Sequence, residues 1–268
     1  MNKEAVSSVA GDRRSFLKGA GLTGIGLASV ALVGKQFGTG EQRVEAASIS
    51  DIDVLNFALN LEYLEAEFYA VATYGATLVE LGVITSMDQT GPTTGGQMVP
   101  GFAKLPEAFL ASALRIDEIK HVLLLRSALG SNAVKKPAIN LDALGYGFAN
   151  VNDWLKLARQ FEDVGVSAYL GAAPLINTSP YLATAAAILG TEAQHSGSIR
   201  DVCIMNGVTS PAVDSLDVPP TPNTPYDVDE NGLSIPRSTS QVLNIVYAGG
   251  RSSGGFYPEG MNGSIATQ

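Results

Sequence analysis

The sequence has one cysteine and few charged residues. Cys203 is the only cysteine among 268 residues, which excludes an intramolecular disulfide and a cysteine-rich iron–sulfur or rubredoxin-type centre. We expect Cys203 to be a buried and unreactive thiol. Only 16% of the residues are charged while 46% are apolar, a composition typical of a globular protein with one sizeable core.

The N-terminal segment has the order of an export signal. An arginine pair at 13–14 precedes Ser-Phe-Leu-Lys, an apolar stretch over 19–34 and a cleavage-type site at Ala46. The pair resembles the twin-arginine signal, although Asp12 stands where that signal usually has Ser or Thr. The apolar stretch is shorter than the roughly 20 residues of a membrane span, which disfavours an anchor, although a retained signal stays open. We expect 1–46 to be a twin-arginine-type signal peptide.

This signal has consequences for location and partners. We expect the twin-arginine export machinery to recognise it and to deliver the protein to the periplasm, the cell envelope or the extracellular space. Residues 1–46 carry six basic and four acidic side chains, so their removal changes the net charge from −9 to −11. Such an acidic chain is not expected to bind nucleic acid.

Four segments have the hydrophobic periodicity of helices. They cover residues 50–74, 105–130, 151–176 and 180–206. The last two are separated by a short turn, which predicts antiparallel neighbours. The pattern therefore predicts an all-α protein built on a bundle of four helices.

The remaining segments divide the chain into a bundle and an extension. We expect the bundle over 47–206, with a long connection over 75–104 that serves as a crossover or a lid. Residues 207–268 form a Pro-rich C-terminal extension that packs on the bundle and contains a short helix near 239–248.

Each of the four predicted helices has a glutamate in the middle of its apolar face. These positions call for hydrophobic residues, yet they hold Glu62, Glu118, Glu162 and Glu192. Both histidines of the chain, His121 and His195, follow a glutamate by three residues, which puts them on the same helix face. Two Glu-x-x-His turns that alternate with two single-glutamate helices form a specific pattern.

Burial of four carboxylates in one core requires neutralisation. An ionised carboxylate in a protein interior costs several kcal/mol, and four would also repel one another. Two divalent cations would cancel four negative charges, and two neutral imidazoles would complete the ligand sets. Mixed oxygen and nitrogen ligands favour iron or manganese, and zinc stays open. The alternative is that these residues pair with core partners or face solvent.

The ligand order resembles that of the ferritin-like superfamily of di-iron and di-manganese carboxylate proteins. Members often carry a tyrosine seven residues after each single glutamate, as Tyr69 and Tyr169 do here. The resemblance covers about 50–206. With the signal, the loop and the tail, it points to bacterial exported proteins related to plant desiccation-associated proteins. It implies a ferritin-like antiparallel four-helix bundle.

The resemblance also implies roles for the six residues. Glu62 and Glu162 are terminal ligands in the family's geometry, and Glu118 and Glu192 bridge the two ions. Tyr69 and Tyr169 are then hydrogen-bonding neighbours of the ligands rather than radical carriers. Glu65 and Glu67 lie off the apolar face, so we expect them at the surface or beside the ligands.

Several activities are compatible with such a site. The resemblance implies an oxidoreductase that acts on oxygen, peroxide or ferrous iron in stress protection. The alternative is a non-enzymatic envelope or stress-related protein with a structural metal or none. The signal, loop and tail argue against a 24-subunit iron store and leave a homodimer as an assembly to be tested.

A second acidic segment begins at Asp227. Its first six residues match the opening of a calcium-binding loop, but the twelfth position is Ser238 instead of the bidentate glutamate, and Pro236 intervenes. We therefore expect a turn stabilised by Asp and Asn side chains rather than a calcium site.

Overall fold

The computed structural model describes residues 49–102 and 107–268. The predicted signal peptide, 1–46, lies outside these residues. In this part of the chain, none of the helices has both the length and the hydropathy that crossing a membrane requires.

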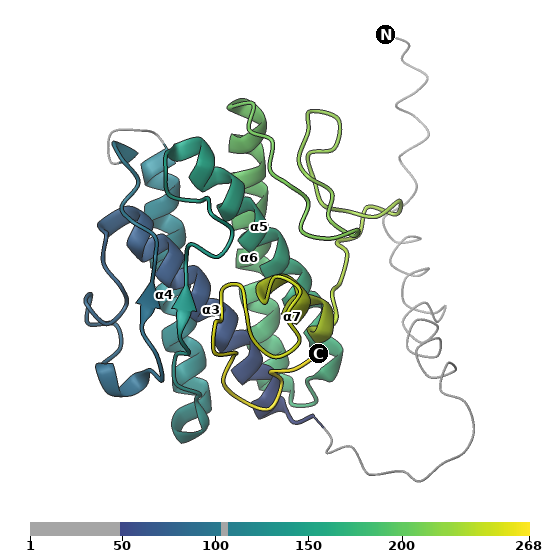
Figure 1. Cartoon of the computed structure of the whole chain (residues 1–268). Coiled ribbons are helices and arrows are strands. Elements are labelled where there is room, and N and C mark those ends of the chain that lie inside the picture. The colour runs from purple at the N-terminus through teal and green to yellow at the C-terminus, as the bar shows by residue number, and fades with distance from the viewer. Residues whose placement is uncertain (1–48, 103–106) are drawn as a thin grey trace. The chain divides into compact units, whose positions relative to one another are not determined.

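The protein is an all-α antiparallel four-helix bundle, as predicted (Figure 1). Its four long helices are α3 (Asp51–Tyr74), α4 (Glu107–Leu129), α5 (Val151–Ala172) and α6 (Ser179–Met205). The first two pack chiefly on each other, as do the last two, and the two pairs then face one another. Three of the helices lie within their predicted ranges, and α6 begins one residue earlier than predicted.

Capping residues explain where the helices begin and end. Ser50 and Asp53 form a reciprocal capping box at the start of α3, and Gly75 ends it in the left-handed conformation, with φ 65°. The Asn150 side chain accepts a hydrogen bond from the backbone N–H of Asp153 at the start of α5. These contacts satisfy backbone groups that the helix ends leave without partners.

The long connection after α3 is folded against the next one along the chain. It contains β1 (Thr93–Thr94), which pairs in parallel with β2 (Ile139–Asn140) in the α4–α5 connection. The fully buried Glu67 carboxylate accepts a hydrogen bond from Leu78 N at 3.1 Å and lies 3.8 Å from Lys136 Nζ. The expectation of a surface or ligand-side position for Glu67 is therefore wrong, because these connections cover the outer side of α3.

The C-terminal segment covers α3 from another side. It contains α7 (Thr239–Val246) and then crosses α3, as the yellow trace in Figure 1 shows. Tyr257 Oη donates to the backbone carbonyl of Asn60 at 2.7 Å, and Asn60 Nδ2 donates to the carbonyl of Asn262 at 2.8 Å. As a result, every residue from Val54 to Ala72 is buried.

Apolar packing between the helix pairs closes the core near the site. Trp154 is fully buried at the start of α5, where it stacks with Phe68 and meets Phe102 edge to face. Cys203 is buried as expected, and this burial raises the pKa of its thiol to about 12. At neutral pH the thiol is therefore protonated and unreactive.

Candidate metal centre

The six predicted ligands meet in the interior of the bundle. The four carboxylates are at most 1% exposed and the two imidazoles at most 7% exposed. One glutamate comes from each long helix, and the imidazoles come from α4 and α6. The six residues are Glu62, Glu118, His121, Glu162, Glu192 and His195.

These residues form two overlapping sets of donor atoms. The first set is Glu62, Glu118, His121 and Glu192, and the second is Glu118, Glu162, Glu192 and His195. Within each set the donor atoms all lie within 4.8 Å of one another. Glu118 and Glu192 belong to both sets, which is the position that a bridging carboxylate needs. The terminal and bridging roles themselves stay predictions.

Each imidazole directs Nδ1 at the carboxylates. His121 Nδ1 lies 3.1 Å from Glu118 Oε2 and 3.2 Å from Glu62 Oε2. His195 Nδ1 lies 2.8 Å from Glu118 Oε1 and 3.4 Å from Glu162 Oε2. The two ring centroids are 6.3 Å apart, and each imidazole belongs to a different donor set.

Two tyrosines bind the single glutamates across the bundle. Tyr69 on α3 donates to Glu162 Oε1 on α5, and Tyr169 on α5 donates to Glu62 Oε1 on α3. Burial, followed by the charge of the bonded carboxylate, raises the pKa of both phenols well above its ordinary value, so both remain donors. Each tyrosine thus fixes one carboxylate oxygen and leaves Oε2 directed at the cluster.

Proximity shifts the pKa values of the cluster strongly. Burial and then the charge of Glu62 raise the pKa of Glu118 to about 7, and burial followed by Glu118 raises that of Glu192 well above its usual range. Burial opposes protonation of His195, but the nearby carboxylates of Glu118 and Glu162 outweigh it and raise the pKa of His195 to about 11. The cluster therefore strongly attracts positive charge.

Several buried atoms of the cluster have no hydrogen-bond partner, and a bound cation would supply one. Both carboxylate oxygens of Glu192, Oε2 of Glu162 and Nδ1 of His195 are buried without a hydrogen-bond partner. Buried polar atoms without partners are rare because each costs about 1–3 kcal/mol. Carboxylate oxygens with imidazole nitrogens are donors that iron, manganese and zinc accept, so these residues fit a metal ion.

A glycine on α5 provides space for these carboxylates. A Cβ atom on Gly165 would collide with Glu192 Oε2 and would lie 3.3 Å from Glu65 Oε1. Glu65 is only 5% exposed, so it is part of the interior and the surface alternative for it is wrong. A glycine inside a helix costs about 1 kcal/mol relative to alanine, which indicates that the space matters here.

Substituting this glycine tests the packing of the site. In Gly165→Ala the added methyl group would displace the Glu192 carboxylate, and we expect metal affinity to fall at least tenfold. Gly190→Ala on α6 is the matched control, because nothing lies within 4 Å of its added Cβ. It should melt slightly higher than the wild type and bind metal normally. Metal per chain after dialysis checks this, and wild-type retention by Gly165→Ala would contradict it.

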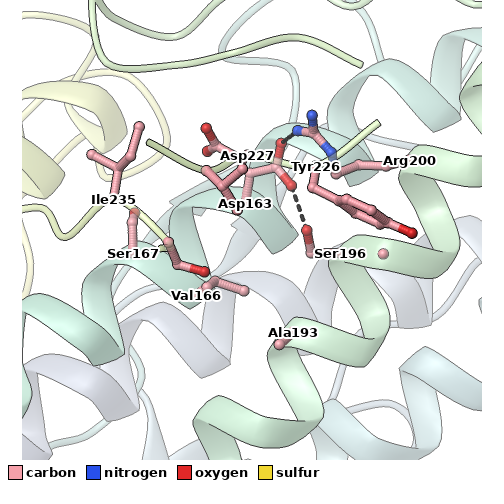
Figure 2. A pocket seen from close by; sticks show the side chains of 12 residues that line it. Asp163, Val166, Ser167, Ala193, Ser196, Arg200, Tyr226, Asp227 and Ile235 are labelled. Carbon is pink, nitrogen blue, oxygen red and sulfur yellow. Dashed lines mark hydrogen bonds and ion pairs between the residues drawn. The ribbon is translucent and has the colours of Figure 1, made fainter. Parts of the chain in front are cut away.

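An ion-pair network that the sequence did not reveal holds α5 against α6 beside the ligands. Figure 2 shows Asp163, the neighbour of Glu162, between Arg200 and Ser196, with hydrogen bonds of 2.6 Å to each. Arg159 lies 3.4 Å from the same carboxylate and donates to both Asp217 oxygens. The network connects helix turns that carry ligands to the C-terminal segment.

Asp163, Ser196 and Arg200 of this network line a cavity of about 170 Å³, together with Tyr226 and Asp227 from the C-terminal segment. Asp163, Asp217 and Asp227 lie close enough together to suggest a cation site. The buried guanidinium groups of Arg159 and Arg200 already neutralise the first two, so we interpret the cluster as a structural network.

The acidic turn after this cluster follows the sequence prediction. Asp229 Oδ1 accepts hydrogen bonds from the backbone N–H groups of Asn231 at 2.8 Å and Leu233 at 2.9 Å. This is a side-chain-stabilised turn, in which the carboxylate oxygen is used by the backbone.

Each of the four helices contributes one carboxylate, and two of them carry a Glu-x-x-His turn. These features define a ferritin-like bundle of the metal-carboxylate class. A family model described as "Ferritin-like domain" matches residues 50–204, and the chain belongs to this family.

Two characterised proteins are similar to the chain. The desiccation-related protein PCC13-62 of Craterostigma plantagineum is 26% identical over 168 residues, which cover 56% of this chain and 52% of that protein. The chain thus spans about half the length of this relative. The ferritin-like catalase Nec2 of Nesocodon mauritianus is 23% identical over an alignment of 274 positions, gaps included, that covers 81% of this chain and 85% of that protein.

Proposed function

We propose that this chain is an exported di-metal oxidoreductase that holds two iron or manganese ions and consumes hydrogen peroxide. The observation that carries the proposal is the pair of overlapping donor sets that share Glu118 and Glu192. Two sets joined by shared carboxylates suit two ions close together rather than one. Similarity to a ferritin-like catalase over most of both chains supports peroxide as the substrate.

The residues of the site have different proposed roles. Glu62, Glu162, His121 and His195 would hold one side of each ion, and Glu118 and Glu192 would lie between the ions. A bound metal pair supplies two-electron redox chemistry, by which two peroxide molecules become two water molecules and one dioxygen molecule. Tyr69 and Tyr169 keep their protons and orient the terminal carboxylates.

Burial sets the conditions inside the site. The carboxylates have almost no contact with solvent, so electrostatic interactions between them and a cation are stronger than in water. Tyr69, which donates to Glu162, packs edge to face with Phe68 and Trp154, so the surroundings of this tyrosine are apolar.

The N-terminal sequence supports an exported location. The arginine pair and the apolar stretch after it motivate the proposal that the twin-arginine machinery moves the protein out of the cytoplasm. Proteins that use this route are typically folded before export, which would allow the metal to be inserted first.

The test has two measurements on freshly purified protein. We expect two equivalents of iron or manganese per chain by mass spectrometry and release of one dioxygen for every two peroxide molecules consumed at an oxygen electrode. Glu192→Gln should lose both properties, because one of its oxygens becomes an amide. Glu67→Gln, a buried substitution away from the ligands on α3, is the matched control and should retain both.

The outcomes separate the candidate functions. Less than one metal ion per chain in folded protein would contradict the metal site. Two ions without peroxide consumption would favour a non-enzymatic stress-related role, to which the similarity to a desiccation-related protein points. Oxidation of added ferrous iron without peroxide consumption would indicate a ferroxidase-like protein.

A further inference from the structure

Glu65 is a buried carboxylate without a partner of opposite charge. It lies one helical turn after Glu62 on α3 and is only 5% exposed. Among the described residues, none donates a hydrogen bond or a positive charge to it. Burial raises the pKa of Glu65, and the groups that raise it further are carboxylates, with Glu192 first and Glu118 next. A core carboxylate with only negative neighbours needs a function to explain its position.

A position on the opposite helix shows that Glu65 lies beside the cluster, outside its two donor sets. The same Gly165 Cβ position that would collide with Glu192 Oε2 lies 3.3 Å from Glu65 Oε1. Oxygens of both carboxylates therefore converge on one point of α5. Glu162 is followed three residues later by this glycine, whereas Glu62 is followed three residues later by Glu65. The bundle thus accommodates an additional carboxylate on the α3 side only.

On this geometry, and on the di-metal function proposed above, we propose that Glu65 is a fifth carboxylate of the metal centre and gives an oxygen to the ion pair beside Glu192. Four carboxylates balance two divalent ions. A fifth makes the site more negative than two divalent ions require, so it strengthens cation binding and favours a pair whose total charge exceeds +4. The fifth carboxylate also gives one of the two donor sets one ligand more than the other.

Manganese titration of the full chain tests this proposal. Protein stripped with a chelator is titrated with Mn²⁺, and free Mn²⁺ is followed by electron paramagnetic resonance. We expect Glu65→Gln to raise the dissociation constant of at least one of the two ions tenfold or more. The matched control Glu67→Gln, equally buried on the same helix, should change neither constant by more than twofold.

A purely structural role would have a different signature. Loss of a structural hydrogen bond would destabilise ion-free Glu65→Gln and leave its Mn²⁺ affinity unchanged, and this result overturns the proposal. We expect the opposite: an ion-free variant at least as stable as the wild type, since a carboxyl group that faces other carboxylates has been removed.

Two further measurements keep the proposal testable if Glu65→Gln does not fold. Glu65→Asp keeps the charge but withdraws the oxygen, and it should weaken Mn²⁺ binding. Anomalous diffraction from Mn²⁺-loaded wild-type crystals should place an ion about 2.0–2.6 Å from a Glu65 oxygen. A separation above about 4 Å overturns the role of Glu65 alone. A wild type that binds no Mn²⁺ overturns this role together with the proposed di-metal function.

Discussion

Removing the bound ions with a chelator should lower the melting temperature of this protein by about 10 °C or more. An ion present at about 100 times its dissociation constant stabilises the folded state by about 2.7 kcal/mol, so two contribute about 5 kcal/mol. A domain of this size shifts by roughly 2–4 °C per kcal/mol. The physical source is neutralisation of four carboxylates that are at most 1% exposed. Differential scanning calorimetry with and without a chelator measures the shift.

Two controls identify the source of this stabilisation. Adding Mn²⁺ back to stripped wild-type protein should restore the melting temperature. The double variant Glu118→Gln with Glu192→Gln should not respond to the chelator, because the two residues shared by both donor sets can no longer balance cations. A melting temperature that is the same with and without chelator in metal-loaded wild-type protein would refute the prediction.

The ion-free protein should become less stable as the pH rises from 6.5 to 8, whereas the ion-loaded protein should not. The pKa of Glu118 is raised to about 7 and that of His195 to about 11, so the folded state holds more protons than the unfolded state in this window. Each additional proton lowers the free energy of unfolding by about 1.4 kcal/mol per pH unit. The pKa of Glu62 is lowered, because its hydrogen bond and charge pairing with His121 outweigh burial, so it stays ionised here and contributes nothing.

Bound cations replace these protons, so metal affinity rises with pH and offsets the loss. Urea unfolding at pH 6.5, 7.2 and 8, with and without Mn²⁺, should therefore give two curves that diverge as the pH increases. An ion-free stability that is constant or rises over this range would mean that the cluster is not protonated in the folded state.

The four helices and the six candidate ligands could be predicted from sequence because their signals are local. Period-3.6 patterning, Gly75 and Asn150 fix the helix bounds, and a glutamate at an apolar position is visible in a single helix. The tyrosine spacing also selects Glu62 over its neighbours, and the structure places Tyr69 and Tyr169 in contact with the opposite glutamates.

The burial of Glu65 and Glu67 could not be predicted in the same way. The analysis of an apolar face assumes that the opposite face of the helix meets solvent, and α3 has no such face. Its outer side is covered by segments distant in sequence, as the contacts of Asn60 with Tyr257 and Asn262 show. No local sequence pattern indicates such contacts between distant segments.

The ion-pair network was missed for a related reason. Arg159 and Arg200 resemble ordinary polar positions of their helices, because their partners Asp217, Val218 and Pro225 lie in the Pro-rich segment. Arginines fully buried by a long-range connection can be found only when the tertiary fold is known.

The buried arginines also bear on how the protein is made. Arg159 is fully buried and donates hydrogen bonds to Ser210 and Asp217, both of which leave the ribosome after all four long helices. Until then its guanidinium lacks these partners, and breaking a buried pair of this kind costs about 3–5 kcal/mol. The α5–α6 pair therefore reaches its final packing only after synthesis of the C-terminal segment. A nascent chain released early would expose the ligand-bearing helices to chaperones and proteases.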